Sequence, residues 1–331
     1  MINLIKTFPA QLEEALELTK QINASEISKG EIQHIVISGM GGSGIGAHLV
    51  KSIVEDYCKL PITLIQGYNL PLWVNSKTLF IACSYSGNTE ETLTILELAR
   101  EETKHIFSVT TGGKLKEISD KENYPQYNFS GEAACPRAGL AYPSVAVLML
   151  LYKLGFCSNL DIEAELKSSI NLLTEEQEGI QSEARSIAKK VQGYFTFIYS
   201  DQKFYPATLR FQQQLAENSK QVSHSHVFPE LNHNELVGWV FPEEHIKKSK
   251  AILLRSNFEH GRNQKRMDIS KTILADKAEV IELIAKGKSF TQQLYYFIHL
   301  IDWISFYLAE ENQIDPFPVE TINYLKNKLA E

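Results

Sequence analysis

The chain has 331 residues, 44% hydrophobic and 22% charged, with 33 basic and 40 acidic residues for a net charge of −7. This composition is typical of a folded globular protein of about two domains, so it excludes disorder over the whole chain. The sequence shows neither the basic excess of a nucleic-acid binder nor the roughly 18–20-residue apolar run of a membrane span, so we expect no nucleic-acid or membrane partner.

The first half of the chain alternates short apolar runs with helical patterns. An amphipathic helix is predicted over residues 9–22. Strands are predicted over 34–40, 62–66, 78–83, 105–110 and 124–129, and helices over 45–57 and 88–100. Continuous apolar strands that alternate with helices are typical of a parallel sheet covered on both faces.

The second half repeats this alternation after a polar, helix-prone segment over residues 161–192. Strands are predicted over 194–200, 251–256 and 279–284, and helices over 207–220, 260–274 and 290–309. A tail over 315–331 begins with the helix-breaking stretch DPFPV and ends in a short helix. We therefore predict two α/β domains, 1–155 and 193–331, joined by a helical linker over 156–192.

A glycine-rich turn, ISGMGGSGIGAH, follows the first predicted strand and opens a helix. Glycines allow close backbone approach and a helix N-terminus favours anions, so Gly41, Gly42 and Ser43 are candidate phosphate ligands. The turn matches G-x-G-x-x-G, but the second strand ends at Gln66 without the carboxylate that a dinucleotide site uses, and it is no Walker A loop. The alternative is a turn that only permits tight helix–strand packing.

A hydroxyl-rich turn, SYSGNTEET, follows the third predicted strand. Ser84, Ser86 and Thr89 supply uncharged donors for phosphate oxygens, and the next helix adds its dipole. The alternative is helix capping by Ser86 or Asn88, although a cap needs only one hydroxyl. Neutral hydroxyls and amides, without a metal or a P-loop lysine, favour a sugar phosphate over ATP.

Together these two turns resemble the sugar isomerase (SIS) domain, in which a Ser-x-Ser-Gly-x-Thr turn binds a phosphosugar beside a five-stranded parallel sheet. The motifs CPRAGLAYPS (135–144), LAENSK (215–220), ELNHNEL (230–236) and the DPFPV…YLK tail resemble the bifunctional phosphoglucose/phosphomannose isomerases of the phosphoglucose isomerase superfamily, over essentially the whole chain. The resemblance implies an α/β fold of two SIS domains, a hexose 6-phosphate substrate, no cofactor and a homodimer.

Aldose–ketose isomerisation moves a proton between C1 and C2, which needs a base, a ring-opening group and a cation near the developing charge. By resemblance Glu217 is the base, and His233, contributed by the neighbouring subunit, opens the ring. Arg137 stabilises the enediolate, and Lys326 reaches the substrate from the C-terminal tail, where Lys328 is the alternative. Taken alone, Glu217 is more typical of a solvated helix, His233 of a loop or a helix start, and Arg137 of a surface loop.

A histidine pair offers a rival interpretation. His224 and His226, with Glu230 and His233, could bind zinc. The two imidazoles share a face only if their segment is extended, and Pro229 interrupts it. Because the residues implied above already fill every catalytic role, we predict no metal ion.

The second half keeps only Ser200 of the phosphate turn, within YSDQKFYPA (199–207). We therefore expect the first domain alone to bind phosphate, near the carboxyl ends of its strands. A non-catalytic phosphosugar-binding protein is the main alternative, and it predicts a fused DNA-binding domain or loss of Glu217 and His233. A glucosamine 6-phosphate synthase needs an N-terminal cysteine nucleophile, whereas the chain begins Met1-Ile2.

The sequence also bears on the cellular location of the protein and on its assembly. The N-terminus lacks a signal-peptide pattern, and the four cysteines (Cys58, Cys83, Cys135, Cys157) form no CxxC pair, so we predict a cytoplasmic protein without disulfides. The helix predicted over 290–309 is apolar around most of its circumference, so it must lie in a core or an interface. An interface would agree with the homodimer.

Overall fold

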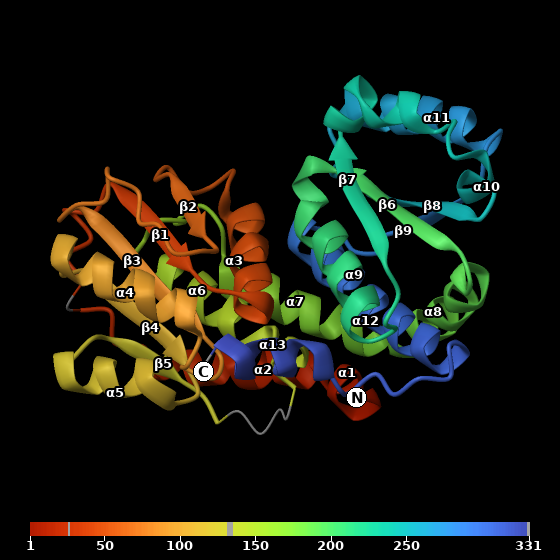
Figure 1. The fold of residues 1–331 in the computed structure, drawn as a ribbon. Coiled ribbons are helices and arrows are strands. Elements are labelled where there is room, and N and C mark those ends of the chain that lie inside the picture. The colour runs from red at the N-terminus through yellow and green to blue at the C-terminus, as the bar shows by residue number, and fades with distance from the viewer. Residues whose placement is uncertain (26, 131–134, 330–331) are drawn as a thin grey trace. The chain divides into compact units, whose positions relative to one another are not determined.

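The computed structural model describes residues 1–25, 27–130 and 135–329 (Figure 1). The chain forms two compact units: a first unit of Lys6–Thr174, and a second unit of Glu175–Glu331 with Met1–Ile5. Each unit contains one parallel sheet with helices on its faces, which confirms the predicted α/β class. The segment predicted as a helical linker contains α7 (Ile162–Glu175) and α8 (Gln177–Val191).

The first unit contains a five-stranded parallel sheet in the order β2-β1-β3-β4-β5, as the resemblance implied. Its strands are β1 (His34–Ser38), β2 (Ile62–Ile65), β3 (Thr78–Ser84), β4 (Ile106–Thr110) and β5 (Gln126–Asn128). Its helices are α2 (Phe8–Leu18), η1 (Thr19–Gln21), α3 (Gly41–Val54), α4 (Glu90–Glu102), α5 (Gly113–Glu122), η2 (Pro136–Ala138) and α6 (Ala141–Lys153). Helix α3 begins inside the glycine cluster, at Gly41 rather than at residue 45.

Apolar side chains hold the helices of the first unit to its sheet. On one face Val36, Phe80 and Ala82 form a buried cluster with Ile95 of α4 and Leu115 of α5. Helices α3 and α6 pack against each other and against strands of the same sheet, and α2 packs on α6. Because β3 is buried along its whole length, the sheet fixes where the turn after β3 begins.

The second unit contains a four-stranded parallel sheet in the order β7-β6-β8-β9. Its strands are β6 (Phe195–Asp201), β7 (Ser223–Phe228), β8 (Ser249–Arg255) and β9 (Glu279–Ile284). Its larger helices are α8, α9 (Tyr205–Glu217), α11 (Gly261–Ala275), α12 (Phe290–Glu311) and α13 (Glu320–Leu329). The short helices are α1 (Ile2–Lys6), η3 (Gln202–Phe204), η4 (Glu230–His233), η5 (Glu235–Gly238) and α10 (Glu243–Ile246). Strand β7 was not predicted, because its sequence SHSHVF contains no apolar run.

The two faces of β7 contact different parts of the second unit. Ser225 hydrogen-bonds Gln212 of α9, so α9 covers this face. His224 and His226 alternate with Ser225 along the strand and contact Glu235 of η5 on the opposite face. The side-chain contacts therefore place helix α9 and the η4–η5 segment on opposite faces of the second sheet.

The predicted apolar helix is α12, and it is a core helix. Nearly all of its residues are buried, and it packs against α8 and α9 of the same chain. Because α12 is covered within the second unit, its apolar surface gives no support to the predicted homodimer. Among the described helices, none is both long and apolar enough to cross a membrane.

His299 on α12 makes folding stability depend on pH. Its ring is fully buried, and this burial lowers the pKa of His299 to about 3. The unfolded chain takes up this proton below about pH 6.5, whereas the folded chain does not until about pH 3. Protons therefore favour unfolding between these values, and the contribution present above pH 6.5 is lost as the pH falls.

We expect the free energy of unfolding at pH 5.5 to be lower than at pH 7.5, with about 1.4 kcal/mol of the difference due to His299. Urea unfolding of the wild type and of His299→Gln at both pH values measures this contribution. The variant loses stability at both values, but its pH-dependent difference is smaller by that amount. An unchanged difference would show that His299 is not the titrating group.

Candidate active site

The glycine turn lies at the carboxyl edge of the first sheet, against the end of β3. A Cβ atom on Gly39 would lie 2.9 Å from the carbonyl oxygen of Cys83, so a larger residue cannot be accommodated without a shift. Gly41 adopts a φ of +50°, which favours glycine. Gly41, Gly42 and Ser43 form the first turn of α3, where the Ser43 N–H donates to the Met40 carbonyl at 3.0 Å. The positive end of the helix dipole at this turn favours an anion.

The hydroxyl turn uses Ser84 and Thr89 to hold itself together. Their hydroxyl oxygens lie 2.9 Å apart, and the Thr89 N–H donates to Ser84 Oγ at 3.4 Å. Ser86 is exposed, and its Oγ accepts the Asn88 N–H at 3.3 Å, which leaves its own O–H to donate. The capping alternative is wrong, because Thr89 is the N-cap of α4 and makes no side-chain cap bond.

The loop after β4 fixes the shape of the hydroxyl turn. Gly87 has a φ of +69°, and a Cβ atom there would lie 1.7 Å from the carbonyl oxygen of Gly112. The Leu115 N–H donates to the Gly87 carbonyl at 2.9 Å, and the Thr111 hydroxyl donates to the Tyr85 carbonyl at 2.8 Å. The glycine of the SYSGNT motif is therefore required by the close approach of this loop.

The predicted cation, Arg137, lies in the loop that packs against both turns. A Cβ atom on Gly42 would lie 3.0 Å from the Pro136 carbonyl oxygen and 3.6 Å from Arg137 Cα. The ring of Tyr85, from the hydroxyl turn, lies so close to Gly139 that a Cβ there would come within 2.5 Å of it. Arg137 is only 7% exposed. The structure thus brings the glycine turn, the hydroxyl turn and the Arg137 loop together; these three segments are called the cradle below.

The predicted base, Glu217, is the last residue of α9 and is half-buried. The next two residues anchor it: Asn218 Nδ2 donates to Ser305 Oγ at 2.9 Å, and Ser219 Oγ donates to the Ser305 carbonyl at 2.7 Å. Lys220 Nζ donates to the Glu217 carbonyl at 2.7 Å. The LAENSK motif therefore fixes the backbone of Glu217 against α12.

A buried ion pair clamps the rest of α9 to α12. Arg210 contacts both carboxylate oxygens of Asp302, through Nε at 2.9 Å and Nη2 at 2.6 Å. Gln214 Nε2 also donates to Asp302 Oδ1, at 3.0 Å. Such a bidentate pair has little rotational freedom, so the helix that carries Glu217 is held rigidly.

The structure does not bring Glu217 and His233 together within one chain. His233 is the exposed last residue of η4, on the face of the second sheet opposite to α9. The two side chains are therefore separated by the sheet itself. Lys326 is exposed on α13, and its role, like the roles of Glu217, His233 and Arg137, stays a prediction.

The carboxyl edge of the second sheet is unsuited to a phosphate. Ser200 is buried and its hydroxyl contacts Thr208, while Asp201 accepts hydrogen bonds from the Lys203 N–H and from the Asn263 side chain. Burial raises the pKa of the nearby Glu259 to about 7. At the carboxyl edge of its sheet the second unit has carboxyl groups, whereas the first unit has glycines and hydroxyls. Carboxylates repel a phosphate, which supports the expectation that only the first unit binds phosphate.

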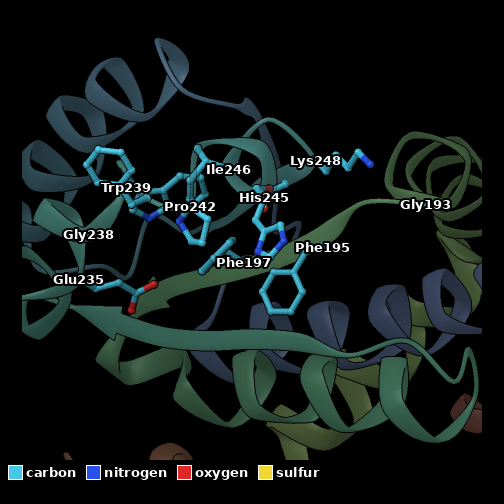
Figure 2. Close-up of a pocket in the computed structure, with 12 residues that line it drawn as sticks. Gly193, Phe195, Phe197, Glu235, Gly238, Trp239, Pro242, His245, Ile246 and Lys248 are labelled. Carbon is cyan, nitrogen blue, oxygen red and sulfur yellow. Dashed lines mark hydrogen bonds between the residues drawn. The ribbon is translucent and has the colours of Figure 1, made fainter.

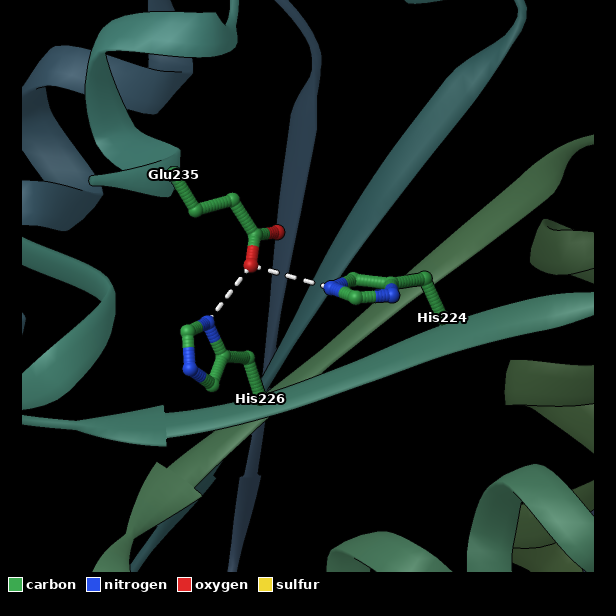
Figure 3. Close-up of side chains that lie close together, drawn as sticks. All are labelled: His224, His226 and Glu235. Atoms are coloured by element: carbon green, nitrogen blue, oxygen red, sulfur yellow. Dashed lines mark hydrogen bonds and ion pairs between the residues drawn. The ribbon is translucent and has the colours of Figure 1, made fainter.

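Sequence reasoning found two members of one polar cluster of the second unit, His224 and His226, but missed the third, Glu235. His224 Nε2 and His226 Nδ1 lie 2.9 and 2.8 Å from the same oxygen of Glu235 (Figure 3). The expectation that Pro229 breaks this segment was wrong, because β7 is extended through both histidines and ends before the proline. Glu235, rather than Glu230 or His233, is the third member. The sequence signal for this cluster was the pair of alternating histidines, followed by a short loop that carries a glutamate.

Several known proteins are similar to this chain. A family model of the bacterial phospho-glucose isomerase C-terminal SIS domain matches residues 180–329. The bifunctional phosphoglucose/phosphomannose isomerase of Caldicellulosiruptor bescii is 36% identical, with 100% of this chain and 99% of that protein covered. The enzyme of the same name from Aquifex aeolicus is 35% identical, with 90% of each covered.

A solved structure extends the likeness to the fold. The C-terminal domain of glucosamine-fructose-6-phosphate aminotransferase from Francisella tularensis matches with a TM-score of 0.76 at 17% identity, over 95% of this chain and 97% of that one. At this identity the match shows a shared fold and not the activity. The full-length relatives establish that this chain belongs to the bifunctional phosphoglucose/phosphomannose isomerase family of SIS-domain proteins.

Proposed function

We propose that the protein isomerises hexose 6-phosphates, converting glucose 6-phosphate and mannose 6-phosphate to fructose 6-phosphate by metal-independent proton transfer. The observation that carries the proposal is the cradle: two helix N-termini, a donating hydroxyl at Ser86 and the buried Arg137 loop meet at one sheet edge. This arrangement suits a phosphate monoester without a metal ion. A phosphosugar substrate agrees with the predicted cytoplasmic location.

In the proposed reaction each of the predicted residues has its own step. The cradle holds the phosphate, and His233 transfers a proton between the ring oxygen and the C1 hydroxyl to open the sugar. Glu217 removes the proton from C2 of the aldose, and the electron pair forms the C1–C2 double bond of an enediolate. The Arg137 guanidinium stabilises the negative oxygen. The proton of the C2 hydroxyl then passes to O1, and Glu217 returns the carbon-bound proton to C1, which leaves the C2 carbonyl of the ketose.

Separation of Glu217 and His233 by the second sheet supports a shared site. If both side chains act on one sugar, a single chain cannot supply them at the same place. A second copy of the chain can supply His233 to the Glu217 of the first, and two-fold symmetry then makes two equivalent sites. The proposed assembly is therefore a homodimer, and it rests on this separation instead of on α12.

Ser86→Ala tests the phosphate cradle. The Ser86 hydroxyl is exposed, so we expect little change in stability but a KM for fructose 6-phosphate raised about 10–100-fold, as for loss of one hydrogen bond to a charged group. If the hydroxyl holds the phosphate equally in the ground and transition states, kcat changes little. Steady-state kinetics measure both constants. Ser168→Ala, on α7 of the same unit, is the control, and equal KM values for the two variants would remove Ser86 from the site.

A coupled assay with each sugar phosphate, after dialysis against a chelator, tests the function itself. We expect fructose 6-phosphate to form from both aldoses at undiminished rates. Turnover that disappears on chelation and returns with zinc would contradict metal independence. Tight binding of fructose 6-phosphate without turnover would instead favour the non-catalytic phosphosugar-binding alternative.

A further inference from the structure

We propose that His224, His226 and Glu235 form a binding site for one divalent transition-metal ion of the zinc class, separate from the phosphate cradle. The two histidines are two residues apart on β7, so their side chains leave the same face of the strand. Glu235 reaches them from η5, the next but one element along the chain. Two imidazole nitrogens and a carboxylate oxygen form a common ligand set for zinc.

The spacing of the three ligand atoms suits a metal ion. One oxygen of Glu235 lies 2.9 Å from His224 Nε2 and 2.8 Å from His226 Nδ1, and all three atoms lie within 4.8 Å of one another. Bonds of about 2.0–2.2 Å to a tetrahedral ion require ligand atoms roughly 3.3 Å apart. Small rotations of the two rings therefore place the ion between the three side chains.

Surrounding contacts orient the ligands. The Tyr199 hydroxyl donates to the other oxygen of Glu235, and Trp239 Nε1 donates to the Tyr199 hydroxyl at 3.0 Å. Tyr199 and Trp239 are both buried, so this chain holds the Glu235 carboxylate in one orientation. Hydrogen bonds to the second oxygen of a ligating carboxylate are typical of protein metal sites.

Access and coordination number also agree with an ion. The side chains of His224, His226 and Glu235 are 44%, 29% and 18% exposed, so solvent reaches the cluster and water can complete the coordination. Glu235 also lies in the wall of a pocket of about 560 Å³, whose other walls are mostly aromatic and apolar side chains, including Phe197 and Trp239 (Figure 2). With three protein ligands and an open fourth position, the site would hold an ion and tie η5 to β7.

Zinc titration of untagged, chelator-treated protein against a chromogenic competitor tests the site. We expect one Zn²⁺ per chain, with the dissociation constant raised at least 10-fold in His224→Ala, His226→Ala and Glu235→Gln. Tyr199→Phe removes only the hydrogen bond to Glu235, and we expect it to weaken binding by about 10-fold. Cobalt(II) provides a second measurement, because its visible absorption bands report tetrahedral coordination by these ligands.

His245→Ala is the matched control, since His245 lines the same pocket but is not a member of the cluster. We expect it to bind Zn²⁺ like the wild type, and circular dichroism checks that every variant is folded. Two results would overturn the proposal: less than one Zn²⁺ bound per wild-type chain, or equal affinity in the wild type and the His224→Ala/His226→Ala double variant. Because binding and not turnover is measured, either result leaves the isomerase proposal standing.

Discussion

Glu217→Gln is expected to lower kcat by about 10²–10⁴-fold, because the amide cannot accept the proton that must leave C2. KM should change little, since in the proposed site the cradle of the first unit, and not Glu217, holds the phosphate. The substitution is nearly isosteric, and the backbone of Glu217 is held by Asn218 and Ser219 against α12, so the fold should persist. Steady-state kinetics with glucose 6-phosphate and with mannose 6-phosphate measure the loss.

Glu178→Gln is the control for Glu217→Gln, because it removes the same charge from an exposed helical position of the second unit. We expect its kcat to equal that of the wild type. If Glu217→Gln lowers kcat for only one of the two aldoses, the result would contradict a single base for both epimers. A kcat within a few-fold of the wild type for both substrates would exclude Glu217 as the base.

Mixing two inactive variants should restore activity if the site is shared. Glu217→Gln and His233→Ala each remove one member from every site of a homodimer. In a mixed dimer, one site receives the intact Glu217 of one chain and the intact His233 of the other, while the second site has neither. After random exchange of subunits, half of the dimers are mixed, so we expect about a quarter of wild-type sites to recover.

Native mass spectrometry confirms that mixed dimers have formed before activity is compared. The matched control mixes Glu217→Gln with Glu217→Ala, where no arrangement of chains restores a site. Activity of the first mixture that stays at the sum of its separate variants, although mixed dimers are present, would contradict the shared site. The phosphate cradle would then have to receive both side chains from one chain.

Sequence reasoning succeeded where structure is determined by neighbouring residues. The turns that contain Gly41 and Ser86 follow buried apolar strands, and the positions of their glycines reflect steric contact, as at Gly87 against Gly112. Strand β7 was missed because it lies at the edge of its sheet, where polar and apolar side chains both find partners. Its residues Ser225 and His226 bond to opposite neighbours, which no periodicity of hydrophobicity records.

Contacts between distant segments were beyond prediction from local patterns. Glu235 approaches His224 and His226 only because the η4–η5 segment returns along β7. The sequence also gave no indication that Glu217 and His233 lie on opposite faces of one sheet, since this depends on the crossover through α9. The apolar character of α12 was evident, but only the structure shows that α8 and α9 cover it.

Transfer of an isotopic label from C2 tests most directly whether a carboxylate carries the proton between the two carbons. The wild-type protein converts glucose 6-phosphate deuterated at C2 in ordinary water, and NMR spectroscopy measures deuterium at C1 of the fructose 6-phosphate formed early in the reaction. A carboxyl group exchanges its proton with solvent, so if Glu217 carries the proton we expect part of the deuterium to be lost to water. Complete retention of the label at C1, as in a direct hydride shift, would contradict this role of Glu217.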